Sequence, residues 1–127
     1  MQNEPFSIKK RLKSFVYAFN GIKILIRDEH NARIHLLATI CVIVLGFYLN
    51  ISTLEWIAVL FAIGFVFAME MTNSAFENLC DFASPEKHET IKKVKDLAAG
   101  AVLFSAISAL IIGLIIFIPK IFLIYRK

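Results

Sequence analysis

The sequence has few of the residues that build disulfide-stapled, metal-clustered or glycine-loop proteins. Its two cysteines, Cys41 and Cys80, set no disulfide or metal framework, and we interpret both as small buried apolar side chains. Its five glycines are scattered, so the chain contains no P-loop and no glycine-rich dinucleotide fingerprint. A nucleotide site in this protein would therefore be neither a Walker site nor a protein-kinase site.

Charge is also sparse. Charged residues make up 19% of the 127 residues and hydrophobic residues 58%, with a mean hydropathy of +0.71, which is too apolar for an ordinary soluble domain. The net charge is +4, and no basic patch is interleaved with aromatic residues. This argues against a nucleic-acid partner and favours an anionic lipid surface. The basic first 33 residues lack an uninterrupted apolar core, so we expect no cleavable signal peptide.

Three apolar runs approach the roughly 20 residues that a membrane-spanning helix needs. We predict transmembrane helices over residues 34–50, 54–80 and 97–118 within a single domain, residues 1–127. Apolar side chains spaced three and four apart over residues 6–27 predict an amphipathic helix in the membrane interface, or alternatively one packed on the bundle. The sequence Asp28-Glu29-His30-Asn31 interrupts this pattern. The expected fold class is therefore an all-α membrane protein.

The placement of lysine and arginine predicts the orientation. Seven of these residues precede the first span and four lie in the connection 81–96, whereas the turn at 50–52 has none. The positive-inside rule then places the N-terminus and the second connection in the cytoplasm. Lys120, Arg126 and Lys127 would lie outside, which mildly opposes the rule. Within the second connection, Ser84-Pro85 predicts a helix N-cap followed by proline at the first helical position.

Two glutamates and an asparagine, Glu70, Asn73 and Glu77, interrupt the second apolar run. At about 100° per residue, Glu70 and Glu77 share one stripe of the helix with Ser74 and Asp81, and Asn73 lies beside it. Charge inside a membrane run is costly and usually marks a functional site. The alternative is a polar network that fixes helix packing, but the run holds no basic partner for its acids.

The predicted topology gathers polar side chains at the cytoplasmic end of the bundle. Glu77 and Asp81 end the second span there, and Glu70 lies about 10 Å deeper. Residues from other segments join them, namely Glu29, Lys95 and Asp96. Asp81 is as consistent with a structural contact at the helix end as with catalysis, and His30, His35 and His88 are interpreted first as ordinary interfacial histidines.

This arrangement suits phosphoryl transfer to a lipid. Glu29 and Glu77 are candidate oxygen ligands for a hard cation such as Mg²⁺, and Lys95 is a candidate phosphate contact. Glu70, in a drier setting, is a candidate general base at the depth of a lipid hydroxyl, which Asn73 would orient.

The segment 70–81, EMTNSAFENLCD, resembles the signature of the prokaryotic diacylglycerol kinase family, which also contains undecaprenol kinases. Lys95-Asp96 with the segment 98–103, AAGAVL, resembles the second block of that family. Residues 15–21, and Glu29 with Arg33, resemble its N-terminal pattern, so the resemblance extends from residue 8 to residue 119.

The resemblance implies a bacterial inner-membrane lipid kinase, a homotrimer whose active sites are shared between protomers and use Mg-ATP. It implies that Glu70 is the catalytic base, that Asn73 supports the site, and that Glu29 and Glu77 bind the metal. It further implies nucleotide contacts by Tyr17, Glu86, Lys87, His88, Lys95 and Asp96.

Departures from the family pattern bear on the lipid. Phe19 replaces a tryptophan of the diacylglycerol-specific branch, and the ending over residues 116–120 is more like the undecaprenol-kinase branch, which slightly favours undecaprenol. Cys80 and Val94 replace an aliphatic residue and an alanine without removing a catalytic group. Two other classes stay open: a small cation transporter or channel subunit with the stripe lining its pathway, and a non-catalytic adaptor whose acids bind a basic partner.

Overall fold

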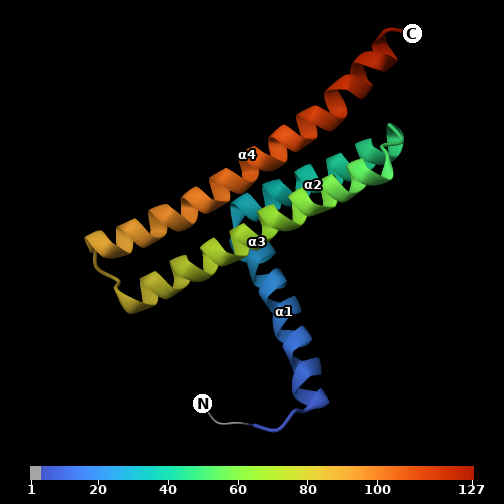
Figure 1. Ribbon diagram of the computed structural model, residues 1–127. Helices are drawn as coiled ribbons and strands as arrows, with labels where there is room; N and C mark the ends of the chain where they lie inside the picture. The colour runs from blue at the N-terminus through green and yellow to red at the C-terminus, as the bar shows by residue number, and fades with distance from the viewer. Residues whose placement is uncertain (1–3) are drawn as a thin grey trace.

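The computed structural model describes residues 4–127 and consists there of four helices joined by short connections. They are α1 (Ile8–Asp28), α2 (His30–Tyr48), α3 (Thr53–Ala83) and α4 (Glu89–Tyr125). Helices α2, α3 and α4 lie side by side, and α1 leaves the bundle and projects away from it (Figure 1). Each of the three bundled helices is long and apolar enough to cross a membrane, as the sequence predicts.

A single extended residue, Glu29, separates α1 from α2, where the sequence predicts a break. Arg33 closes this corner because its guanidinium donates to the carbonyl oxygens of Ile26, at 2.9 Å, and of Arg27. Carbonyls at a helix end lack intrahelical partners, so these bonds fix the direction in which α2 leaves α1. Arg27 also donates to the carboxylate of Asp28 at 2.7 Å, and this hydrogen bond lowers the pKa of Asp28.

The turn between α2 and α3 is tight and well capped. Asn50 has a left-handed φ of 51°, which asparagine tolerates better than most residues. Ser52 and Glu55 form a reciprocal capping box: Glu55 N donates to Ser52 Oγ at 3.2 Å, and Ser52 N donates to Glu55 Oε2 at 2.8 Å. Lys120 of α4 lies 3.3 Å from the same carboxylate oxygen and joins α4 to this end of α3.

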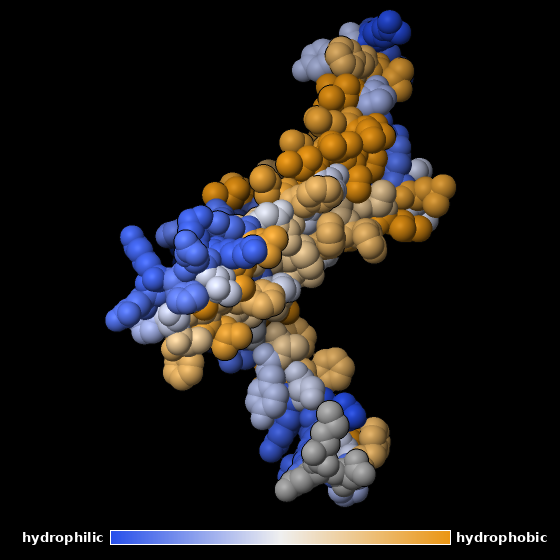
Figure 2. Space-filling model, turned by 60° about the vertical axis from the view of Figure 1, so that its left-hand side comes forward, coloured by the Kyte–Doolittle hydropathy of each residue, from blue (hydrophilic) through white to orange (hydrophobic). Residues whose placement is uncertain are grey.

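The hydrophobic core of one chain is small and lies at the same end. Ile51, Val59, Ile116 and Phe117 are buried together there. Much of the remaining apolar surface of the long helices is exposed, and Figure 2 shows it as hydrophobic surface along the bundle, with hydrophilic surface at the end where α3 joins α4. The interpretation of the cysteines is confirmed for Cys80, which is buried, and wrong for Cys41, which is exposed. An apolar run alone does not show which of its sides faces outward.

The predicted N-cap at Ser84 is wrong. Ser84 ends α3 instead, with its N–H bonded to the Cys80 carbonyl at 2.9 Å, and α4 begins only at Glu89. The N-cap is His88, whose Nδ1 accepts from Thr90 N at 3.1 Å. The physical reason is the reversal of chain direction, because the residues between 83 and 89 are used to turn α4 back along α3 (Figure 1).

Candidate active site

Glu70 is buried at the N-terminal end of the stripe that the sequence singles out. Its side chain projects from α3 toward α2 and is only 2% exposed. Nε2 of His35 lies 3.0 Å from Glu70 Oε1, yet no donor among residues 4–127 makes an aligned hydrogen bond to that oxygen. Because an unpartnered buried carboxylate oxygen is costly, the fold alone gives no reason for a glutamate here.

Glu29 reaches the same stripe from the corner between α1 and α2. Ser74 Oγ donates to Glu29 Oε1 at 2.8 Å, one helical turn from Glu70. The hydroxyl of Ser74 is buried, whereas Glu29 stays half-buried. The structure therefore brings two carboxylates from different helices to neighbouring turns of α3.

Asn73 and Glu77 are a loosely joined pair on α3. Asn73 Nδ2 is 3.5 Å from Glu77 Oε1, at the long limit of a hydrogen bond, and Asn73 Oδ1 is buried without a partner in the described chain. Asn73 lines a groove between α3 and α4 of about 310 Å³, together with Val94 and Leu97. The Asn73 side chain thus lies at the site with an amide oxygen that accepts no hydrogen bond from the described residues.

The carboxylates of the described residues do not form a closed metal cage. No group of three or more histidine, cysteine, aspartate or glutamate side chains within residues 4–127 is arranged to hold a metal ion. Mg²⁺ is usually held by one or two carboxylates, with waters and substrate phosphates completing its octahedron. Glu29 and Glu77 are both half-buried, so each carboxylate keeps a side that water or a phosphate can reach, as an open set of this kind requires.

Lys95 and Asp96 pair with different partners. Lys95 Nζ lies 2.5 Å from Asp81 Oδ1 on α3, and Asp96 accepts from Lys92 at 2.6 Å within α4. A cavity of about 520 Å³ lies at the α3–α4 connection, bordered by Asp81, Glu86, Lys87, His88, Lys92, Lys95 and Asp96. Five of the six residues for which the resemblance implies nucleotide contacts thus line one cavity.

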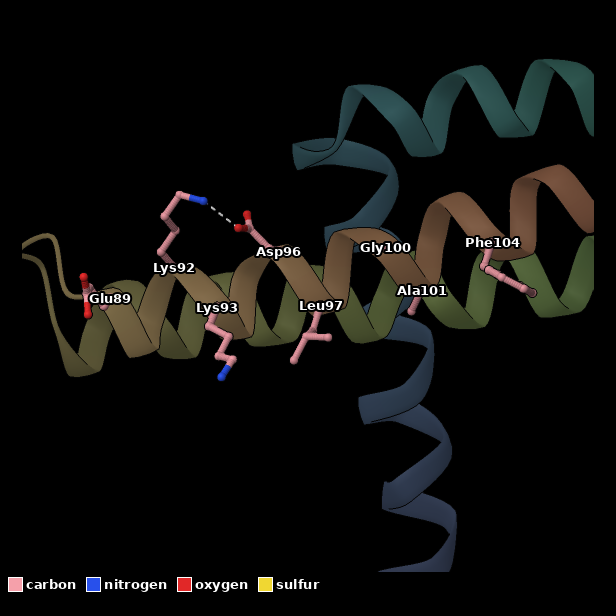
Figure 3. A pocket seen from close by; sticks show the side chains of 8 residues that line it. All are labelled: Glu89, Lys92, Lys93, Asp96, Leu97, Gly100, Ala101 and Phe104. Carbon is pink, nitrogen blue, oxygen red and sulfur yellow. Dashed lines mark hydrogen bonds and ion pairs between the residues drawn. The ribbon is translucent and has the colours of Figure 1, made fainter.

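Asp96 also lies beside an open, shallow region whose lining residues all belong to α4 (Figure 3). Figure 3 shows Asp96 and Lys92 on one side of α4, and Lys93 and Leu97 on the other. A Cβ at Gly100 would meet no side chain and no neighbouring helix within 4 Å, so this face of α4 is open. Asp96 is therefore turned toward open space as well as toward the α3–α4 connection.

Tyr17 is not brought to the other candidate residues within one chain. It lies on α1, with 69% of its surface exposed. Helix α1 leaves the bundle near its middle, whereas the α3–α4 connection lies at the bundle's end (Figure 1). The contact of α1 with α3 is near Gly21, where a Cβ would lie 3.7 Å from Met71 Cε.

His35 is the residue at this site that sequence reasoning missed. It was interpreted as an ordinary interfacial histidine, but it lies against Glu70 and, with Thr39, is one of two polar residues lining an otherwise apolar cavity of about 460 Å³. The sequence offered one signal for this contact, which is the depth of the two residues within their helices. His35 lies six residues into the bundle from Glu29, about 9 Å, and Glu70 lies about 10 Å inward from Glu77.

Comparison with known sequences yields a family and several relatives. The sequence profile described as prokaryotic diacylglycerol kinase matches residues 16–117. The undecaprenol kinase of Bacillus subtilis is 39% identical over 113 residues, covering 89% of this chain and 92% of that protein. The diacylglycerol kinase of Synechocystis is 33% identical over 109 residues, covering 85% of this chain and 62% of that protein. The diacylglycerol kinase of Escherichia coli is 25% identical over 111 residues, covering 87% of this chain and 91% of that protein.

Proposed function

Because this chain belongs to the prokaryotic diacylglycerol kinase family, we propose that it transfers the γ-phosphoryl group of ATP to the hydroxyl of undecaprenol. The protein is a lipid kinase and a multi-pass membrane protein, and its family implies the use of ATP. The higher identity to an undecaprenol kinase than to the diacylglycerol kinases supports the choice of lipid, and diacylglycerol is the second candidate. The observation that carries the proposal is the buried carboxylate of Glu70, whose Oε1 has no aligned donor in the described chain.

Glu70 acts as the general base in this proposal. As the lipid oxygen bonds to the γ-phosphorus, its proton passes to the Glu70 carboxylate. The bond between the γ-phosphorus and the bridging oxygen breaks, and ADP leaves. Asn73 orients the hydroxyl, which is consistent with the unpartnered acceptor that it carries beside the stripe.

In this proposal Glu29 and Glu77 would hold Mg²⁺ and leave open positions for waters and the phosphates of ATP. When bound, the ion neutralises charge on the transferring phosphoryl group. The hydrogen bond from Ser74 supports this role because it steadies one oxygen of Glu29 and leaves the other available as a ligand.

The nucleotide binds at the α3–α4 connection through Lys95, Asp96 and the segment 86–88. The cavity there supports this assignment, since its walls carry lysines, a histidine and carboxylates at the polar end of the bundle. Lys95 exchanges its exposed partner Asp81 for a phosphate oxygen, at little cost because a surface ion pair contributes little stability.

A homotrimer with active sites shared between protomers accounts for the residues that one chain leaves apart. Tyr17 and one side of Asp96 are exposed in a single chain and so are accessible to a second copy, and the exposed apolar helix faces offer surface for association. Helix α1 lies in the cytoplasmic interface of the bacterial inner membrane, with the N-terminus inside, as the excess of lysine and arginine supports.

A side-by-side lipid assay tests the function. Purified protein in mixed micelles, with Mg-ATP and either undecaprenol or diacylglycerol, is expected to phosphorylate undecaprenol with the higher kcat/KM. Phosphorylation of neither lipid by folded protein would overturn the proposal, and a preference for diacylglycerol would overturn the choice of lipid. Cation flux in sealed liposomes without ATP would instead support a transporter, which the kinase family does not favour.

A further inference from the structure

The contact between α2 and α3 beside Glu70 includes a side chain, that of His35, which has no role in the proposed mechanism. His35 Nε2 lies 3.0 Å from Glu70 Oε1, and the His35 side chain is 25% exposed while that of Glu70 is 3% exposed. The imidazole borders the apolar cavity between α2, α3 and α4, so it stands between that cavity and the carboxylate. A titratable side chain seldom lies at membrane depth without a partner or a function.

We infer that His35 is a positioning residue for Glu70: its ring N–H directs one carboxylate oxygen and leaves the other to receive the lipid proton. This inference rests on the proposed role of Glu70 as the base. The distance is already that of a hydrogen bond, and only the direction of the N–H is missing. The outer torsion of a histidine side chain is broad, so rotation of the ring can turn the N–H toward this oxygen.

The chemistry of the pair favours imidazole over an apolar side chain at position 35. A base must hold one rotamer to meet a hydroxyl, and a charge-assisted hydrogen bond from a neighbouring helix fixes both the rotamer and the oxygen that is used. Among the described residues, His35 is the basic side chain whose nitrogen lies within ion-pair distance of the Glu70 carboxylate. A lysine or arginine there would form a strong ion pair and weaken the carboxylate as a base.

The test compares His35→Leu, which keeps bulk and removes the donor, with His35→Gln, which restores an N–H donor without titrating. A lost hydrogen bond to a charged group predicts a kcat lower by about tenfold to 100-fold in the leucine variant. The KM values for ATP and lipid are expected to stay near those of the wild type, because His35 touches neither substrate in this mechanism. His35→Gln is expected to recover most of the lost kcat.

Thr39→Val is the matched control because it lies one turn along the same helix, lines the same cavity and loses one polar group. Its kcat is expected to match the wild type. A packing role for His35 would instead show as a lower unfolding temperature, with kcat equal in the leucine and glutamine variants. That result, or a leucine variant with wild-type kcat, would overturn the inference. If the leucine variant does not assemble, His35→Met replaces it as the donor-free variant.

Failure of this inference is separable from failure of the proposed function. An active wild type, an inactive Glu70→Gln and an unchanged His35→Leu would overturn the positioning role alone. An active wild type with an active Glu70→Gln would overturn the base assignment. In a Glu70→Gln background, where no base remains to be positioned, His35→Leu is expected to lower the residual turnover by less than about twofold.

Discussion

Two glutamates of the same helix, Glu55 and Glu70, are treated very differently by the fold. Glu55 accepts a backbone hydrogen bond from Ser52 and lies 3.3 Å from Lys120, so its carboxylate is fully explained by the capping of α3 and its attachment to α4. Glu70 is buried with one close but misaligned neighbour, His35. The structural partners of an acidic residue, more than its presence in an apolar helix, therefore distinguish a residue that stabilises the fold from one that serves a function.

The surroundings of the two residues differ in the same way. The buried cluster of Ile51, Val59, Ile116 and Phe117 lies near Glu55, where the tight turn joins α2 to α3. The other end of α3 is bordered by grooves and exposed ion pairs. One end of the bundle is therefore built for packing, and the other keeps polar groups available for ligands.

The largest expected effect concerns Glu70, the glutamate that the fold leaves without an aligned partner. Glu70→Gln is expected to lower kcat by at least about 100-fold, because an amide cannot accept the lipid proton. The unfolding temperature in detergent is expected to stay the same or rise, since a buried charge is removed. Turnover and thermal unfolding measured on the same preparation check this. Loss of both together would mean that Glu70 is a structural residue after all.

Metal binding gives the next effect. Glu77→Gln and Glu29→Gln are each expected to raise the Mg²⁺ concentration for half-maximal activity by about tenfold to 100-fold, because each removes a carboxylate ligand. A Mg²⁺ titration at saturating ATP measures this. Glu55→Gln is the matched control, since it removes a carboxylate in the capping box at the other end of α3, away from the nucleotide cavity. An equal shift in the control would point to overall charge instead of ligation.

The smallest expected effect concerns Glu55, the glutamate that caps α3. Glu55→Ala is expected to lower the unfolding temperature by a few degrees, because it removes the capping box and the contact with Lys120. Glu55→Gln is expected to lower it less, since glutamine still accepts from Ser52. Both should keep wild-type kcat and KM in the lipid assay. A large loss of turnover in Glu55→Gln would break the distinction between the two glutamates.

Local patterns made much of the fold predictable. Apolar runs and the interruption at Glu29 indicated the helices and the corner between α1 and α2, and the stripe pointed to Glu70. The start of α4 was not predictable from Ser84-Pro85, because a cap signal does not reveal how many residues a reversal needs.

Contacts between helices escaped the sequence for a related reason. The approach of His35 to Glu70 and the pairing of Lys95 with Asp81 depend on how each helix is rotated and shifted against its neighbour. The spacing of apolar residues shows which side chains share one face of a helix. It does not show which face of a neighbouring helix packs against them. The resemblance to a known family identified the residues of the second block without indicating their partners.

The length of α4 has a consequence for how the molecule sits in a bilayer. Its 37 residues extend about 55 Å, against roughly 30 Å of hydrocarbon. An excess of this size is met by tilting or by letting the ends project into water. The first two turns, from Glu89 to Asp96, carry three lysines and form the charged end of this helix, so they are the part expected to project into water. Bilayer thickness is thereby expected to change the height of these lysines over the membrane while the helix itself keeps its length.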